Sequence, residues 1–204
     1  MKLRFDYNNM MEEAIGKEGF KPAVFSKNAS KIAAAQKTVL DNRGKGWQEW
    51  CDLPFMPESE LDELISYCGA VGKKAESFVI LGIGGSALGP LSVASALLHL
   101  HHNELPKEKR NAPKLYVEDN VDPERMAALL DILDLKTSYF NVITKSGETS
   151  ETLSQFLILY SALKKELGTE EAKKHIIVTT TIGKGTLYNV AQSEGFKIYG
   201  VGAG

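Results

Sequence analysis

From Ser77 onward, short runs of apolar residues alternate with segments whose apolar residues recur at helical spacing. Residues 78–81 (Phe-Val-Ile-Leu) form a continuous apolar run, which is typical of a strand buried on both faces of a parallel sheet. Similar runs follow at residues 114–117, 139–143, 176–180 and 196–199. Strands that alternate with helices favour a parallel sheet covered by helices. We therefore expect an α/β fold, a three-layer sandwich around a five-stranded, parallel, doubly wound sheet with right-handed crossovers.

The residues before this pattern have the character of helices and loops. Residues 10–15 and 29–40 contain helix-forming residues, and residues 46–54 (GWQEWCDLP) form a connector. We expect two parts. An amino-terminal helical extension with its connector occupies residues 1–74, and the α/β domain occupies residues 75–204.

The charge balance of the chain limits the partners that it attracts over a distance. The 24 Lys and Arg residues and the 26 Asp and Glu residues give a formal net charge of −2. Such a chain has no global field for nucleic acid or anionic lipid. Its apolar runs also fall far short of the about 20 residues that span a membrane. We therefore expect neither nucleic acid nor a membrane as a partner, and a site for an anion must be local.

Cysteine and histidine usage favours a cytoplasmic protein that holds no metal. Cys51 and Cys68 lack a CxxC spacing and are expected to be reduced thiols. The first residues carry charges and amides where a signal peptide needs an apolar run. His99, His101 and His102 cluster near the end of an expected helix, where polar side chains are common. A metal site is the alternative, but no nearby Cys or spaced acid completes a ligand set, and we expect no metal and no other cofactor.

Two loops at the ends of expected strands carry the chemistry. The first, residues 82–86 (Gly-Ile-Gly-Gly-Ser), directly follows the first strand and opens a helix. Its glycines let backbone amides approach an anion closely, and the helix amino terminus adds N–H groups and a partial positive charge. Ser86 adds a hydroxyl. These features are typical of a phosphate site.

The second loop follows the third strand and also opens a helix. Residues 144–149 (Thr-Lys-Ser-Gly-Glu-Thr) offer three hydroxyls, one cation and one glycine, and such donors suit phosphate oxygens. A simpler interpretation is that Ser146 or Thr149 only caps the helix, while Glu148 and Glu151 complement its dipole. Two loops of this kind on neighbouring strand ends favour one shared phosphate site, because ligands bind beyond the carboxyl ends of parallel strands.

A dinucleotide site is an alternative interpretation of the first loop. Gly82, Gly84 and Ala87 fit the relaxed nucleotide fingerprint, and Glu118 or Asp119 ends the second strand, where an acid would bind a ribose. The distance along the chain from the glycines to that acid exceeds the usual spacing of about 20 residues. This interpretation also assigns no role to the second loop.

Two segments resemble the signature segments of a known family. Residues 79–90 (VILGIGGSALGP) and 141–152 (NVITKSGETSET) are similar to those of bacterial glucose-6-phosphate isomerases, which belong to the sugar isomerase (SIS) superfamily. The segments RFDYNN, GWQEWCDLP and ELPKEKRNAPKLYVEDNVDPE also resemble bacterial members, so the similarity extends over essentially the whole chain. Together the two signature segments are highly specific, whereas either alone indicates only the superfamily.

The resemblance implies that this chain is the amino-terminal half of such a protein and that both loops contact a sugar phosphate. Thr144 replaces a more usual Ser but keeps the hydroxyl. Glu148 replaces a hydroxyl residue, and its carboxylate would oppose a phosphate unless it points away. Glu148 and Glu151 are therefore expected to support the site rather than to bind phosphate directly. The expected phosphate-binding residues are Gly85, Ser86, Thr144, Lys145, Ser146, Gly147 and Thr149.

The resemblance also implies a reaction, the interconversion of glucose 6-phosphate and fructose 6-phosphate through an enediol in glycolysis and gluconeogenesis. In the family, the catalytic Glu, His, Lys and Arg lie downstream of the segment present here. We therefore assign no catalytic residue and expect this chain alone to be inactive. Full-length members are commonly homodimers. The alternative is a stand-alone SIS module that binds a phosphosugar without chemistry, and the reading frame beyond Gly204 distinguishes the two.

Overall fold

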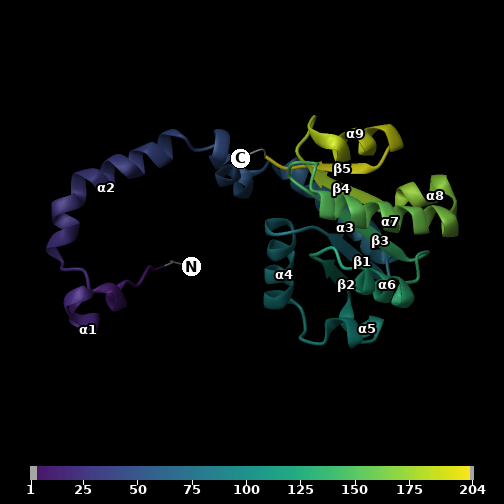
Figure 1. Cartoon of the computed structure of the whole chain (residues 1–204), viewed down its shortest axis with the longest axis horizontal. Coiled ribbons are helices and arrows are strands. Elements are labelled where there is room, and N and C mark those ends of the chain that lie inside the picture. The colour runs from purple at the N-terminus through teal and green to yellow at the C-terminus, as the bar shows by residue number, and fades with distance from the viewer. Residues whose placement is uncertain (1–3, 203–204) are drawn as a thin grey trace. The chain divides into compact units, whose positions relative to one another are not determined.

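The computed structural model describes residues 4–202, and its contacts divide the chain into two compact units (Figure 1). One unit ends at Asp52 and the other begins at Leu53. The helix α3 (Glu58–Lys74) thus belongs by its contacts to the unit that contains the sheet. This division by contacts does not test the domain boundary that the sequence predicts at residue 74, and that boundary stays a prediction.

The first unit consists of helices and turns. The short segments η1 (Asn8–Met10), α1 (Glu12–Ile15) and η2 (Gly16–Glu18) precede the long helix α2 (Ala23–Asp41). η3 (Gly46–Phe55) follows α2 and continues past the boundary between the units. A backbone bridge pairs Met11 with Phe20. Arg43 donates a hydrogen bond of 2.8 Å to Asp52. The helical character expected of the amino-terminal extension is therefore present.

The second unit is built on a five-stranded parallel sheet. Its strands are β1 (Ser77–Leu81), β2 (Lys114–Glu118), β3 (Ser138–Ile143), β4 (Ile176–Thr180) and β5 (Lys197–Gly200), in the spatial order β2-β1-β3-β4-β5. Leu81, at the end of β1, lies in register with Glu118 of β2 and with Val142 of β3. The predicted strands and the predicted fold class are confirmed.

Helices cover both faces of this sheet. Buried side chains of α6 (Pro123–Ile132), α7 (Ser150–Leu167), α8 (Thr169–Lys174) and α9 (Gly185–Glu194) join Val79 and Phe140 in one hydrophobic core. Phe78 and Leu115 point to the opposite face, because successive side chains of a strand alternate. There they line cavities together with residues of α3 and of α4 (Gly85–Leu97). The short segments η4 (His102–Glu104) and α5 (Lys107–Arg110) connect α4 to β2.

Local signals in the sequence determine where several helices begin and end. The Asp122 side chain accepts hydrogen bonds from the backbone amides of Glu124 at 2.9 Å and Arg125 at 3.1 Å, and Pro123 occupies the first helical position of α6. This is the start that Asp-Pro predicts, since Pro fits the first turn of a helix and Asp caps it. α7 ends at Gly168, whose φ of 78° suits glycine.

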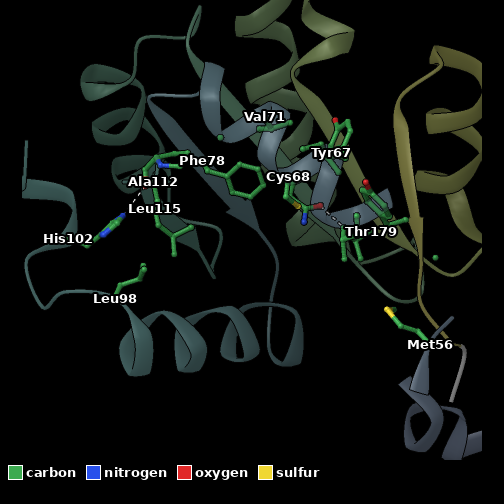
Figure 2. A pocket seen from close by; sticks show the side chains of 17 residues that line it. Met56, Tyr67, Cys68, Val71, Phe78, Leu98, His102, Ala112, Leu115 and Thr179 are labelled. Carbon is green, nitrogen blue, oxygen red and sulfur yellow. Dashed lines mark hydrogen bonds between the residues drawn. The ribbon is translucent and has the colours of Figure 1, made fainter. Parts of the chain in front are cut away.

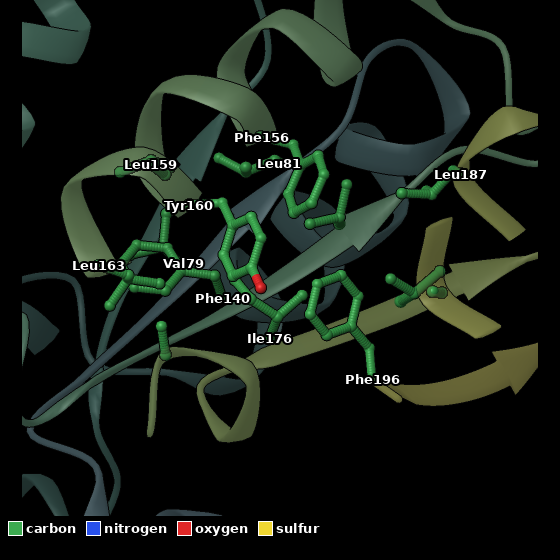
Figure 3. Packing of buried hydrophobic residues seen from close by; sticks show 14 of the residues in the cluster. Val79, Leu81, Phe140, Phe156, Leu159, Tyr160, Leu163, Ile176, Leu187 and Phe196 are labelled. Atoms are coloured by element: carbon green, nitrogen blue, oxygen red, sulfur yellow. The ribbon is translucent and has the colours of Figure 1, made fainter. Parts of the chain in front are cut away.

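The core between the sheet and α7 contains the largest fully buried side chains (Figure 3). The rings of Phe156 and Tyr160 stack on each other with centroids 5.5 Å apart, and Phe196 meets the Tyr160 ring edge-on at 5.2 Å. The Tyr160 hydroxyl donates a hydrogen bond of 2.9 Å to Glu194. Burial and then this bond raise the pKa of Tyr160 to about 12, so its hydroxyl remains a donor at neutral pH.

Two leucines of α7 allow a matched test of this core. Leu159 is fully buried, whereas Leu157 is 64% exposed. Leu159→Ala is expected to lower the free energy of unfolding by about 2–5 kcal/mol, because it removes buried methyl groups and leaves a cavity. Leu157→Ala is expected to change it by less than about 0.5 kcal/mol. Urea unfolding followed by circular dichroism measures both, and equal losses would contradict this assignment of the core.

Candidate functional site

The order of the strands places a topological switch point between β1 and β3. The chain leaves β1 through α4 toward β2 on one side, and it leaves β3 through α7 toward β4 on the other side. The two connections therefore diverge, on opposite faces of the sheet, from neighbouring strands. Open α/β sheets bind ligands at such a switch point, outside the carboxyl ends of the strands. The two predicted loops, residues 82–86 and 144–149, begin where β1 and β3 end, and residues 85 and 86 of the first loop form the start of α4.

The first loop runs close to the end of β3. The amide of Gly82 donates a hydrogen bond of 3.2 Å to the Glu118 carbonyl, which continues the pairing of β1 with β2. A Cβ on Gly82 would lie 2.8 Å from the Cβ of Ser86 and 3.3 Å from the Ile143 carbonyl oxygen. Glycine is therefore required for this approach. The structure brings Ser86, in the first turn of α4, beside the point where β3 ends.

In the second loop, three hydroxyls form one cluster. The Thr144 hydroxyl lies 2.7 Å from the Thr149 hydroxyl and 3.3 Å from that of Ser146, and the latter two are 3.5 Å apart. Thr144 is only 2% exposed, whereas Ser146 is exposed. The Thr149 hydroxyl makes no cap bond to α7, although Thr149 is the N-cap residue. The Thr149 hydroxyl therefore does not cap α7, contrary to the simpler interpretation.

Hydrogen bonds hold this loop against the end of β4 and the segment that follows it. Thr180 donates its hydroxyl to the Thr144 carbonyl at 2.6 Å, and the amide of Thr181 donates to the Lys145 carbonyl at 3.2 Å. The amide of Leu187, in the first turn of α9, donates to the Gly147 carbonyl at 3.0 Å. The shape of the loop consequently depends on a segment that lies about 40 residues further along the chain, as the positions of these partners show.

The backbones of the two segments approach each other closely at Gly147 and Gly185. Both have a positive φ, 72° and 84°. A Cβ on Gly185 would collide with the Ser146 carbonyl oxygen and would lie 2.8 Å from the Gly147 Cα. A Cβ on Gly147 would lie 3.0 Å from the Gly185 Cα. Only glycine at both positions permits this contact, and the sequence analysis did not identify Gly185.

The Glu148 carboxylate is directed to the amino terminus of α9. One carboxylate oxygen accepts from the Thr186 amide at 2.6 Å, and both oxygens lie 3.0 Å from the Thr186 hydroxyl. A carboxylate is favourable there because the first amides of a helix carry a partial positive charge. The Glu148 carboxylate is therefore directed toward Thr186. Sequence reasoning missed Thr186, for which the only signal is a hydroxyl residue in the first turn of a helix.

Two more of the predicted residues lie in the second loop and in the first turn of α7. Lys145 is exposed. Glu151 is also exposed, in the first turn of α7, where its carboxylate accepts a hydrogen bond of 3.1 Å from the Ser150 hydroxyl. This geometry agrees with a carboxylate that complements the helix dipole.

The acids expected for a dinucleotide site are paired with Arg125. Glu118 is buried and lies 3.3 Å from the guanidinium, and Asp119 lies 3.1 Å from it. Burial raises the pKa of Glu118, and the charge of Arg125 opposes that increase. A ribose would have to compete with this cation for both carboxylates, so the structure offers little support for the dinucleotide interpretation.

A cavity of about 470 Å³ lies apart from these loops (Figure 2). It is lined mostly by apolar side chains, among them Tyr67 and Val71 of α3 and Phe78 of β1. Thr179 donates a hydrogen bond of 3.0 Å to Asn141 at its wall. Its lining includes none of the seven residues predicted to bind phosphate. The cavity therefore belongs to the α3 face of the sheet and not to the switch point.

Residues 4–202 contain neither a candidate metal site nor a candidate membrane-spanning helix. Within residues 4–202, His, Cys, Asp and Glu side chains form no group of three that could hold a metal ion. His102 instead bonds the Pro113 carbonyl at 2.9 Å. In the same part of the chain, every helix is too short or too polar to cross a lipid bilayer.

Comparison with known proteins identifies the family. The family model described as Phosphoglucose isomerase matches residues 61–198, which include both loops and all but the last two residues of β5. The chain belongs to the phosphoglucose isomerase family. Its resemblance to bacterial glucose-6-phosphate isomerases is thereby confirmed.

Individual relatives are similar over almost the whole chain. The chain is 43% identical to the glucose-6-phosphate isomerase of Carboxydothermus hydrogenoformans over 201 residues, which is 98% of this chain and 43% of that protein. It is 33% identical to the glucose-6-phosphate isomerase of Shouchella clausii, again over 43% of the relative. The chain thus spans less than half the length of these phosphoglucose isomerase relatives.

Solved structures agree with the fold. A hypothetical protein of Thermus thermophilus superposes on 88% of this chain and 40% of its own, with a TM-score of 0.75 and 31% identity. A glucose-6-phosphate isomerase of Chlamydia trachomatis superposes on 71% of this chain and 25% of its own, with a TM-score of 0.57 and 21% identity. The second likeness shows the fold alone.

Gly185 and Gly183 allow a matched test of the contact between the two loops. Both have a positive φ, but a Cβ on Gly183 would have nothing within 4 Å. Gly183→Ala is expected to cost only the conformational strain, about 1–2 kcal/mol. Gly185→Ala adds a collision with backbone that cannot yield without displacing the 144–149 loop, and a larger loss is expected. Urea unfolding measures both losses, and a Gly185→Ala loss no greater than that of Gly183→Ala would contradict the close approach.

Proposed function

We propose that this chain is the sugar-phosphate-binding part of a glucose-6-phosphate isomerase, which interconverts glucose 6-phosphate and fructose 6-phosphate. The observation that carries the proposal is the cluster of three hydroxyls, Thr144, Ser146 and Thr149, at the switch point of the sheet. The names of the curated relatives supply the reaction. The proposal assigns the phosphate to the expected seven residues, with Glu148 and Glu151 in support.

The chemistry of the loops suits a phosphate dianion. Hydroxyls and backbone amides donate hydrogen bonds to its oxygens, and they do not need to transfer a proton. α4 and α7 both begin at the switch point, so the positive ends of two helices favour negative charge there. The exposed Lys145 adds a cation. With a net charge of −2 over the whole chain, this attraction has to be local.

In this proposal the loops contribute to catalysis by positioning. A phosphate held at one end of the sugar fixes the distance of the reacting carbons from the catalytic groups, which converts a bimolecular encounter into an effectively unimolecular step. The proton transfer through an enediol is assigned to a Glu, a His, a Lys and an Arg that the family resemblance places outside this segment. We therefore propose that the 204-residue chain binds the sugar phosphate without turnover. We also propose that the full-length protein is a homodimer.

Removing single hydroxyls tests the site. Thr149→Val and Ser146→Ala are each expected to weaken binding of fructose 6-phosphate by about 10-fold or more, because a hydrogen bond to a charged group contributes about 1.5–3 kcal/mol. Isothermal titration calorimetry measures the dissociation constants. Inorganic phosphate should lose affinity in parallel, since the lost contact is to the phosphoryl group. Ser154→Ala is the control, because the Ser154 hydroxyl is exposed and bonds only the Ser150 carbonyl of its own helix.

Two results would contradict the proposal. One is a wild-type chain that shows no affinity for fructose 6-phosphate at millimolar concentration. The other is a loss of affinity in Ser154→Ala as large as that in Thr149→Val. Substantial isomerase activity of the chain alone would overturn only the assignment of the catalytic groups to residues outside it.

A further inference from the structure

We propose that Glu148 is a positioning residue, whose carboxylate anchors the phosphate-binding loop to the amino terminus of α9. This inference rests on the function proposed above. From the sequence alone, the Glu148 carboxylate is expected to repel a phosphate. In the structure, this carboxylate accepts hydrogen bonds from Thr186.

The anchor consists of short, charge-assisted contacts. One oxygen of the Glu148 carboxylate accepts a hydrogen bond of 2.6 Å from the Thr186 amide. Each of its two oxygens also lies 3.0 Å from the Thr186 hydroxyl. Hydrogen bonds to an ionised group are about twice as strong as neutral ones. The contact also joins residues 38 positions apart, which belong to the connections after β3 and after β4. It therefore restrains the loop more than a contact between near neighbours would.

A second bond acts at the adjacent residue. The Gly147 carbonyl accepts a hydrogen bond of 3.0 Å from the amide of Leu187. Residues 147 and 148 are consequently both tied to residues 186 and 187, in the first turn of α9. Hydrogen bonds at two consecutive residues restrain the orientation of the loop backbone as well as its position.

The anchored residue also contacts the hydroxyl cluster directly. The backbone amide of Glu148 donates a hydrogen bond of 3.1 Å to the Ser146 hydroxyl oxygen. With that oxygen held as an acceptor, the Ser146 proton is directed elsewhere, either to Thr144 or toward a ligand. Loss of the anchor would let the Glu148 backbone move, and the Ser146 hydroxyl would lose its fixed orientation.

Two roles for Glu148 predict opposite results. If the carboxylate acts only as a negative charge near the phosphate, its removal should tighten phosphate binding, because like charges repel. If it acts as an anchor, its removal should weaken binding, because the loop must then be ordered at the moment of binding. The direction of the change therefore separates the two roles.

The experiment compares Glu148→Ala and Glu148→Gln in the full 204-residue chain. Calorimetry with fructose 6-phosphate and with inorganic phosphate gives the dissociation constants. Glu148→Ala is expected to raise both by about 10-fold, which corresponds to about 1.4 kcal/mol. Glu148→Gln keeps an oxygen that can accept from the Thr186 amide and is expected to remain within about 3-fold of wild type, since a neutral bond is weaker but present. Unchanged or tighter binding in Glu148→Ala would overturn the proposal.

Further variants separate the anchor from general stability. Glu166→Ala removes the same charge from an exposed ion pair with Lys136 near the other end of α7, and it should leave both dissociation constants unchanged. Thr186→Val removes only the hydroxyl and should weaken binding by less than Glu148→Ala. The double variant should lose less than the sum of the two single losses, as expected of residues that interact. Additive losses would contradict a shared anchor, and Thr186→Val keeps the test available if Glu148→Ala does not fold.

Hydrogen exchange gives a readout that needs no ligand. The Leu187 amide should lose protection in Glu148→Ala, whereas the Phe140 amide, bonded to the His175 carbonyl within the sheet, should keep it. Unchanged protection of Leu187 would overturn the anchor. A wild-type chain that binds no sugar phosphate would refute the proposed function. If the wild-type chain and Glu148→Ala bind sugar phosphate equally well, only the anchor is refuted.

Discussion

The parallel pairing of β1 with β3 is the constraint on which the site depends. Leu81 lies in register with Val142, so the two strands end at the same edge of the sheet and their connections begin side by side. Those connections leave toward opposite faces of the sheet, which makes this edge a switch point of the kind where open α/β sheets bind ligands. The same pairing brings the Gly82 backbone close to the Ile143 carbonyl. Two loops that are about 60 residues apart in the sequence can then act on one ligand, as their positions show.

The second loop is not shaped by its own sequence alone. Its carbonyls accept from Thr180, Thr181 and Leu187, and its Glu148 side chain accepts from Thr186. These donors come from the end of β4, from the residue after it and from the first turn of α9. A loop with few buried apolar contacts is usually among the least stable parts of a protein. Here the neighbouring connection supplies the order, which reduces the entropy that a ligand would otherwise have to overcome.

The sequence predicted most of the fold and only part of the site. Continuous apolar runs such as residues 78–81 identify strands reliably, and Asp122 with Pro123 marks a helix start, because both signals are local. The helices α5 and α8, of 4 and 6 residues, were missed since they are too short to show a periodic pattern. Gly185 and Thr186 were also missed, because their partners lie 38 positions away and the pairing exists only once β3 and β4 are adjacent.

The geometry of the three hydroxyls explains why one of them is buried. Each hydroxyl carries one proton, and a hydroxyl can both donate and accept. Thr144 is buried and central, 2.7 Å from Thr149 and 3.3 Å from Ser146. If the Thr144 hydroxyl donates its hydrogen bond to Thr149, the Thr149 hydroxyl can direct its own hydrogen away from the cluster. The amide of Glu148 orients the Ser146 hydroxyl in a similar way. The buried Thr144 hydroxyl can thus determine the direction in which an outer hydroxyl donates, and a phosphate can accept hydrogen bonds from the outer hydroxyls while Thr144 keeps its own partner.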